Sequence, residues 1–207
     1  MKDVAHNHSA IAREGWPWLG AALAVTLLTL RLEGGAWALL PGLITLWLFF
    51  LFRDPGREVP PLPLAVLSPV DGRVKSVEKI SDGPVAGEWY RVRIAASHLG
   101  AYTIRAPIEG TVLTLQREGS HTADCHGLWV RSEEQDDVIL MMPRSWLGLR
   151  PRAFLRYGER VGQGQRFAYL RLAPVAEVYV SASARPRVAP GDRVRAGTSV
   201  LAELRHD

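Results

Sequence analysis

Two apolar runs near the N-terminus constrain the fold of this chain more than any other feature. Residues 16–30 and 36–52 are separated only by Arg-Leu-Glu-Gly-Gly. A membrane span needs about 20 apolar residues, or about 17 in a tilted helix, so each run alone is of marginal length. Together the runs predict a transmembrane helical hairpin, with tryptophans available as interfacial anchors at Trp16, Trp18, Trp37 and Trp47.

The flanking charges predict the orientation of this hairpin. Arg31 is the cation between the runs, whereas Lys2, Arg13, Arg53 and Arg57 lie outside them. The positive-inside rule then places both ends in the cytoplasm. We therefore expect a protein of the inner (plasma) membrane with a cytoplasmic soluble domain. A re-entrant hairpin in one leaflet fits the same pattern, while a cleaved signal peptide fits less well because no small-residue cleavage site follows the first run.

The remaining segments differ in composition. We expect a polar tail at residues 1–15, the hairpin at 16–52, a proline-rich extended linker at 53–66 and a strand-rich domain at 67–207. The first 52 residues carry three basic and three acidic side chains, so the net charge of +4 belongs to the rest. An arginine-rich domain behind an apolar segment favours anionic lipid over nucleic acid as its partner.

The strand-rich domain repeats its turns. Ser-Pro-Val-Asp-Gly-Arg-Val at 68–74 returns as Ala-Pro-Ile-Glu-Gly-Thr-Val at 106–112, and Gly-Glu-Arg-Val at 158–161 returns as Gly-Asp-Arg-Val at 191–194. Acid-Gly steps favour tight turns between short strands. The pattern predicts a mainly β, flattened barrel or sandwich and resembles the lipoyl and biotinyl carrier fold. A carrier function is not expected, because no lysine lies in the required hairpin context.

Residues 169–180, Tyr-Leu-Arg-Leu-Ala-Pro-Val-Ala-Glu-Val-Tyr-Val, alternate apolar and polar positions on both sides of a central Ala-Pro. This period predicts one half-buried strand. Pro174 interrupts it, since proline has no N–H for a strand ladder.

Four segments in order resemble the short, prokaryotic phosphatidylserine decarboxylases. They are Leu-Phe-Arg-Asp-Pro-Gly-Arg-Glu-Val-Pro at 51–60, the two Pro-x-acid-Gly turns at 67–74 and 105–112, and the stretch at 158–180 that ends in the family's active-site strand. The resemblance extends from about residue 36 to the C-terminus. The ordered set behind an apolar hairpin is more specific than any one turn motif.

The resemblance implies a self-processing chemistry. In the family a Gly-Ser bond cleaves itself and leaves a pyruvoyl group, which forms a Schiff base with phosphatidylserine and withdraws electrons as carbon dioxide leaves. An Asp and a His move the protons. Here Asp71 matches the Asp, Tyr102 replaces the His, and Ala173-Pro174 replaces Gly-Ser. We therefore expect no pyruvoyl cofactor and a non-catalytic protein of phospholipid metabolism.

Two other serines offer a displaced centre, which would make the chain an active decarboxylase producing phosphatidylethanolamine. Ser120 follows a glycine in a polar loop, and Ser199 lies within the last turn repeat. The same polar loop holds residues of zinc-ligand type, but a solvated loop is the favoured interpretation and no metal is expected. These residues are His121, Asp124, Cys125 and His126.

Residues 143–160 interleave arginines with large apolar side chains. Arginine suits phosphate, and aromatic or aliphatic groups suit the membrane interface. The segment predicts a lipid-binding surface, with a solvated edge strand as the alternative. We expect membrane phospholipid as the ligand and a second copy or an intact decarboxylase homologue as protein partner. The candidate phosphate-binding residues are Arg144, Arg150, Arg152 and Arg156.

Overall fold

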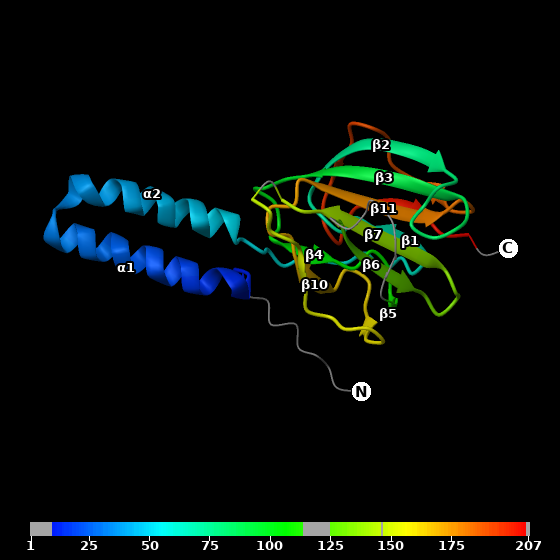
Figure 1. Cartoon of the computed structure of the whole chain (residues 1–207), viewed down its shortest axis with the longest axis horizontal. Coiled ribbons are helices and arrows are strands. Elements are labelled where there is room, and N and C mark those ends of the chain that lie inside the picture. The colour runs from blue at the N-terminus through cyan, green and yellow to red at the C-terminus, as the bar shows by residue number, and fades with distance from the viewer. Residues whose placement is uncertain (1–9, 114–124, 146, 206–207) are drawn as a thin grey trace. The chain divides into compact units, whose positions relative to one another are not determined.

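The computed structural model describes residues 10–113, 125–145 and 147–205 and divides the chain into two compact units (Figure 1). One unit is helical and consists of Met1–Gly56 with Leu99–Tyr102. The other is built from strands and consists of Arg57–His98 with Thr103–Asp207. The helical unit therefore includes a short loop that lies far away in sequence.

The helical unit contains the two expected helices. A 3-10 turn at Arg13–Gly15 leads into α1, Trp16–Leu32, and α2 follows at Gly35–Leu51. Gly34 between them has φ +87°, which glycine adopts without strain. By length and composition, the helical stretch Arg13–Leu32 can cross a membrane, with 20 residues and a mean hydropathy of 1.2, whereas Gly35–Leu51 is apolar but shorter. Insertion of both as a hairpin stays a prediction.

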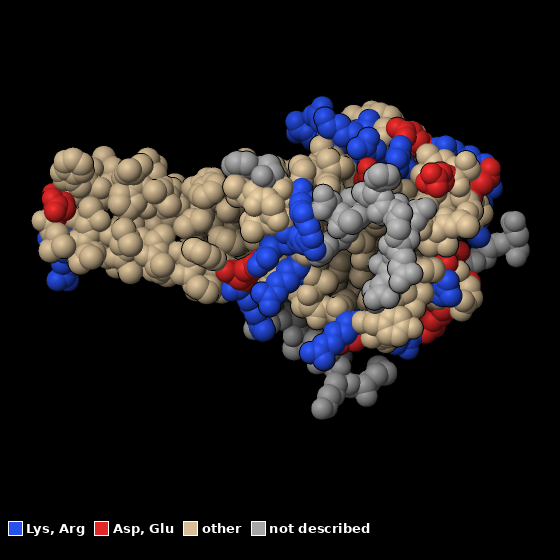
Figure 2. All heavy atoms as spheres, viewed as in Figure 1, with Lys and Arg blue, Asp and Glu red and all other residues tan. Residues whose placement is uncertain are grey.

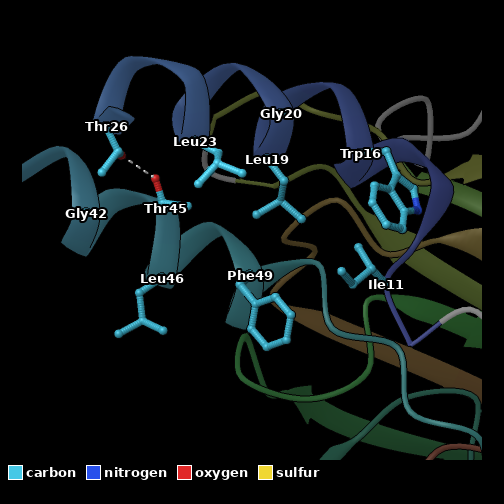
Figure 3. Close-up of a pocket in the computed structure, with 10 residues that line it drawn as sticks. All are labelled: Ile11, Trp16, Leu19, Gly20, Leu23, Thr26, Gly42, Thr45, Leu46 and Phe49. Carbon is cyan, nitrogen blue, oxygen red and sulfur yellow. Dashed lines mark hydrogen bonds between the residues drawn. The ribbon is translucent and has the colours of Figure 1, made fainter. Parts of the chain in front are cut away.

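A groove of about 530 Å³ lies between the two helices (Figure 3). The hydroxyls of Thr26 and Thr45 lie 3.0 Å apart across it. Gly20 leaves open space on its α1 side. The other lining side chains are apolar, so the groove is an apolar surface; its lining comprises Ile11, Trp16, Leu19, Gly20, Leu23, Thr26, Gly42, Thr45, Leu46 and Phe49.

The strand-rich unit has one large sheet and two small ones. The large sheet has the order β13-β2-β3-β11-β7-β6-β5-β9, and the small sheets have the orders β1-β14-β12 and β4-β10-β8. The strands of the large sheet are β2 Gly72–Ile80, β3 Trp89–Ala96, β5 Gly110–Leu113, β6 Cys125–Arg131, β7 Asp137–Pro143, β9 Arg160–Val161, β11 Val175–Ser181 and β13 Arg193–Val194. The small sheets contain β1 Ala65–Leu67, β4 Thr103–Arg105, β8 Arg152–Ala153, β10 Arg166–Tyr169, β12 Arg185–Pro186 and β14 Val200–Glu203.

One hydrophobic core joins these sheets. Alternate residues of β11 and β7 are buried in it, among them Val178 and Leu140, and Phe167 of β10 is its largest fully buried side chain. Period-two alternation places these residues on the inner faces. The expected mainly β, sandwich-like fold of short strands is confirmed.

The first pair of turn repeats lies side by side in the structure. The Leu67 amide donates to the Pro107 carbonyl at 2.8 Å, and the Arg105 amide donates to the Pro69 carbonyl at 2.9 Å. The two bonds are reciprocal, since each turn gives one and receives one. The sequence repeat is therefore also a structural repeat.

The second pair of repeats completes two equivalent halves. In one half β13 pairs with β2 and the Gly191 amide donates to the Val74 carbonyl at 2.9 Å. In the other half β9 pairs with β5 and the Gly158 amide donates to the Val112 carbonyl, also at 2.9 Å. Each Pro-x-acid-Gly turn is thus held by one Gly-acid-Arg-Val turn.

Candidate functional site

Asp71 lies in the turn that precedes β2. One carboxylate oxygen accepts a hydrogen bond from Arg57 Nη2 at 2.7 Å, and the other accepts from the Ala196 amide at 2.7 Å. The ion pair is largely buried, with side-chain exposures of 12% for Asp71 and 16% for Arg57. Three sequence motifs therefore meet at this carboxylate, and its charge-assisted bonds hold them together.

Tyr102 packs within the helical unit. Its side chain is only 7% exposed, and its hydroxyl donates to Glu14 Oε2 at 3.0 Å. Its ring meets Phe52 edge to face, with centroids 4.8 Å apart. Its amide donates to the Arg53 carbonyl at 3.0 Å. The side chain is thus committed to packing and to one carboxylate.

The prediction of a single strand over 169–180 is wrong. β10 ends at Tyr169 and β11 begins at Val175, and the two strands belong to different sheets. A tight turn connects them, closed by the Ala173 amide donating to the Leu170 carbonyl at 3.1 Å. The alternation of apolar residues is real on both sides, but the chain changes sheet at the Ala-Pro step.

The turn before Pro174 has an unusual backbone. Arg171 and Leu172 have φ of 47° and 61°, in the left-handed region. Such a conformation costs about 1–2 kcal/mol for each non-glycine residue, so the turn stores strain. Ala173 is buried, whereas Pro174 is exposed and its carbonyl accepts from the Ala96 amide at 3.0 Å. Pro174 thus occupies a strand entrance, where a missing N–H is tolerated.

Tyr179, further along β11, is held in its neutral form. Burial raises the pKa of its phenol, and its hydrogen bond to Glu177 at 2.7 Å raises this pKa further. Arg93 also contacts Glu177, at 2.9 Å. This part of the strand therefore carries a paired, structural network.

The alternative serine and metal residues are only partly described. The Ser199 hydroxyl accepts from the Arg195 amide at 2.9 Å and closes the last turn. Ser120 and the metal candidates His121 and Asp124 lie outside the described residues, and the other two candidates are described only as backbone of β6. Within the described ranges, no cluster of three or more His, Cys, Asp or Glu suits a metal ion.

Ser145, in the arginine-rich segment 143–160, forms hydrogen bonds to two exposed leucines. The Ser145 hydroxyl accepts from the amides of Leu147 and Leu149, both at 3.2 Å, and the Ser145 amide donates to the Leu149 carbonyl at 2.8 Å. Ser145 itself is buried, while both leucines are exposed. Two leucines that are linked to Ser145 by hydrogen bonds are therefore exposed to solvent.

The candidate phosphate-binding arginines lie in the same segment. Arg150, Arg152 and Arg156 are exposed, and Arg144 is half-buried. Arg152 belongs to β8, an edge strand of the sheet β4-β10-β8, beside the exposed Phe154. Cations and apolar groups share this surface, and Figure 2 shows that Lys and Arg gather on the strand-rich unit and are scarce along the helices.

No protein-family model matches the chain. Individual proteins, however, are similar to it over almost its whole length. A phosphatidylserine decarboxylase proenzyme of Nitrosomonas europaea is 33% identical over 215 residues, which cover 99% of this chain and 100% of the relative. The proenzymes of Cupriavidus pinatubonensis and Ralstonia nicotianae are 34% and 32% identical, each with 96% of this chain covered and 97% and 98% of the relative. The chain belongs to the phosphatidylserine decarboxylase family.

Among solved structures, the glucose permease IIA from Mycoplasma capricolum matches with a TM-score of 0.48 and 16% sequence identity, covering 69% of this chain and 96% of that chain.

The family's pyruvoyl group can be tested against the residues present. Its precursor is a serine whose hydroxyl attacks the preceding carbonyl. Pro174, which the motif resemblance places at that position, has no hydroxyl, and its nitrogen belongs to a ring. A pyruvoyl group therefore cannot form from residue 174 of this chain.

Proposed function

We propose that this chain is a non-catalytic, membrane-anchored member of the phosphatidylserine decarboxylase family that binds phospholipid. The observation that carries the proposal is Pro174 at the entrance of β11, in the place of the self-cleaving serine. The rest of the chain then binds phospholipid without decarboxylating it. A second copy of the chain or an intact homologue would be its protein partner.

The other two family positions support a loss of catalysis. Tyr102 stands in place of the histidine, and its hydroxyl already contacts Glu14. Asp71 is kept, but its carboxylate holds Arg57 and the Ala196 amide. A general base must reach the proton that it moves. Both carboxylate oxygens of Asp71 already accept hydrogen bonds within the fold, which is enough to explain why this residue is present.

The segment 143–160 supports lipid binding. Leu147 and Leu149 are exposed, and their amides donate to the Ser145 hydroxyl, so both side chains are available to enter an interface. Exposed arginines beside them can contact lipid phosphates. The apolar groove between α1 and α2 gives the helical unit a surface suited to acyl chains.

Changing Arg150 and Arg152 to glutamine in a fragment of residues 53–207 is expected to weaken its binding to anionic liposomes. Each arginine near an anionic surface contributes about 1 kcal/mol, so the pair should matter by roughly thirtyfold in affinity at low salt. Liposome co-sedimentation measures this change. The same samples should show no release of carbon dioxide from phosphatidylserine.

The matched control is Arg185→Gln with Arg187→Gln, which removes two exposed charges from β12 and its flank. Thermal unfolding of each fragment establishes that it is folded. If both double variants bind liposomes equally well, segment 143–160 is a solvated edge strand and not a lipid-binding surface. Release of carbon dioxide from phosphatidylserine would refute the non-catalytic assignment.

The proposed membrane anchor can be tested separately from lipid binding. Full-length protein should stay with membranes after a carbonate wash, because α1 and α2 expose apolar side chains along their length. The fragment of residues 53–207 should be soluble or extractable with salt. Release of the full-length chain by the wash would contradict the hairpin anchor on the plasma membrane.

A further inference from the structure

Two arginines face each other at one edge of the large sheet. Arg193 of β13 and Arg73 of β2 are direct cross-strand partners, and both are exposed. Directly opposite residues of an antiparallel pair project to the same face, with Cβ atoms about 5 Å apart. Like charges in that arrangement destabilise a sheet. The pair therefore costs free energy unless an anion lies between its members.

Two more cations extend this group. Lys75 follows Arg73 at a β-bulge, where the register of β2 against β3 shifts between Val74 and Ser76. Arg195 follows β13, and both side chains are exposed. We call Arg73, Lys75, Arg193 and Arg195 the β2–β13 cluster. Figure 2 shows Lys and Arg gathering over the side of the unit where β2 lies.

No carboxylate among the described residues forms an ion pair with the β2–β13 cluster. The nearest acid in sequence, Asp192, accepts a hydrogen bond from the Ala189 amide at 2.8 Å. On neighbouring β3 the pattern is the opposite, since Arg91 contacts Glu78 at 2.5 Å and Arg93 contacts Glu177. The excess of positive charge is thus local to this edge.

The equivalent half of the unit shows that the fold does not require these cations. There Arg160 of β9 faces Thr111 of β5, and Arg160 forms an ion pair with Glu133. The repeat positions that hold Lys75 and Arg195 in one half hold Leu113 and Gly162 in the other. The pairing of β9 with β5 therefore forms with one arginine, which is neutralised by Glu133. The group of four cations occurs only where β13 pairs with β2.

We propose that the β2–β13 cluster binds a phosphate group. Paired guanidinium groups can each donate two hydrogen bonds to phosphate oxygens, and the anion removes the repulsion between them. The same chemistry fits a soluble phosphate compound and the phosphate of an anionic lipid headgroup. The site involves none of the arginines of segment 143–160, so it does not depend on the proposed lipid-binding function.

The test is thermal unfolding of the full chain in an uncharged detergent. Inorganic phosphate should raise the Tm by about 3 °C over sodium chloride of equal ionic strength, because a ligand that binds the folded state stabilises it. Absence of a difference between the two salts would overturn the proposal.

Two double variants establish the location. Arg73→Gln with Arg193→Gln should remove most of the phosphate response and, in low salt without phosphate, unfold at a Tm no lower than that of the wild type. Lys79→Gln with Arg187→Gln removes two exposed cations that are paired with Glu88 and Glu203, and it should keep the response. Equal loss in both double variants would show a net-charge effect and refute the site.

A last arm distinguishes the source of the phosphate. Mixed micelles that contain phosphatidic acid are compared with micelles that contain uncharged diacylglycerol. A Tm rise with phosphatidic acid that is smaller in Arg73→Gln with Arg193→Gln than in the wild type identifies a lipid headgroup at the cluster, because segment 143–160 is the same in both proteins. A response to inorganic phosphate alone identifies a soluble ligand.

Discussion

Replacing Asp71 with alanine is expected to lower the free energy of unfolding by about 3 kcal/mol, the range observed when one partner of a buried ion pair is removed. The change leaves the Arg57 guanidinium without its 2.7 Å partner and the Ala196 amide without its acceptor. Denaturant unfolding of the wild type and the variant measures the difference.

A double-mutant cycle with Arg57→Met isolates the pairwise term, since the double variant no longer buries an unpaired cation. Asp71→Asn should fall between wild type and alanine, because an amide oxygen can still accept from Ala196. Asp192→Ala, at an exposed turn, is the control and should cost about 1 kcal/mol or less. If Asp71→Ala lowers the free energy of unfolding no more than Asp192→Ala does, the Asp71 carboxylate does not have the structural role assigned to it.

Restoring the family's Gly-Ser step is the second change with a large expected effect. Ala173→Gly with Pro174→Ser supplies the hydroxyl, but Tyr102 still stands in the place of the histidine. We therefore expect this double variant to remain uncleaved, and the triple variant with Tyr102→His to yield some cleaved chain. Denaturing electrophoresis and mass spectrometry measure the cleaved fraction.

The matched control for this experiment carries Ala173→Gly, Pro174→Ala and Tyr102→His. It has the glycine and the imidazole but no hydroxyl, so it should stay intact. Efficient cleavage of the double variant would contradict the role assigned to position 102.

Much of the fold follows from local patterns. The apolar runs at 16–30 and 36–52 predicted both helices, because length and composition decide such elements. The acid-Gly repeats predicted the turns at residues 71–72 and 109–110 that join the short strands. These features depend on residues that are close together in the sequence.

Other features depend on contacts between distant segments or on backbone strain. Pro174 indicated an interruption before Val175, but Arg171 and Leu172 adopt positive φ without a glycine to indicate a turn, so the change of sheet was not predicted. The burial of Tyr102 depends on Phe52, which lies in another segment of the helical unit. The motif resemblance predicts that the family's serine and histidine are replaced, whereas no sequence pattern indicated Arg57 as the partner of Asp71.

We expect that the chain does not cleave itself, either at the Ala173–Pro174 bond or at another serine. Denaturing mass spectrometry of the purified wild-type chain tests it most directly. One species of 22.9 kDa with no carbonyl-reactive N-terminus is expected. Two fragments, the smaller beginning with a pyruvoyl group derived from Ser199 or Ser120, would contradict it and make the chain a decarboxylase with a displaced centre.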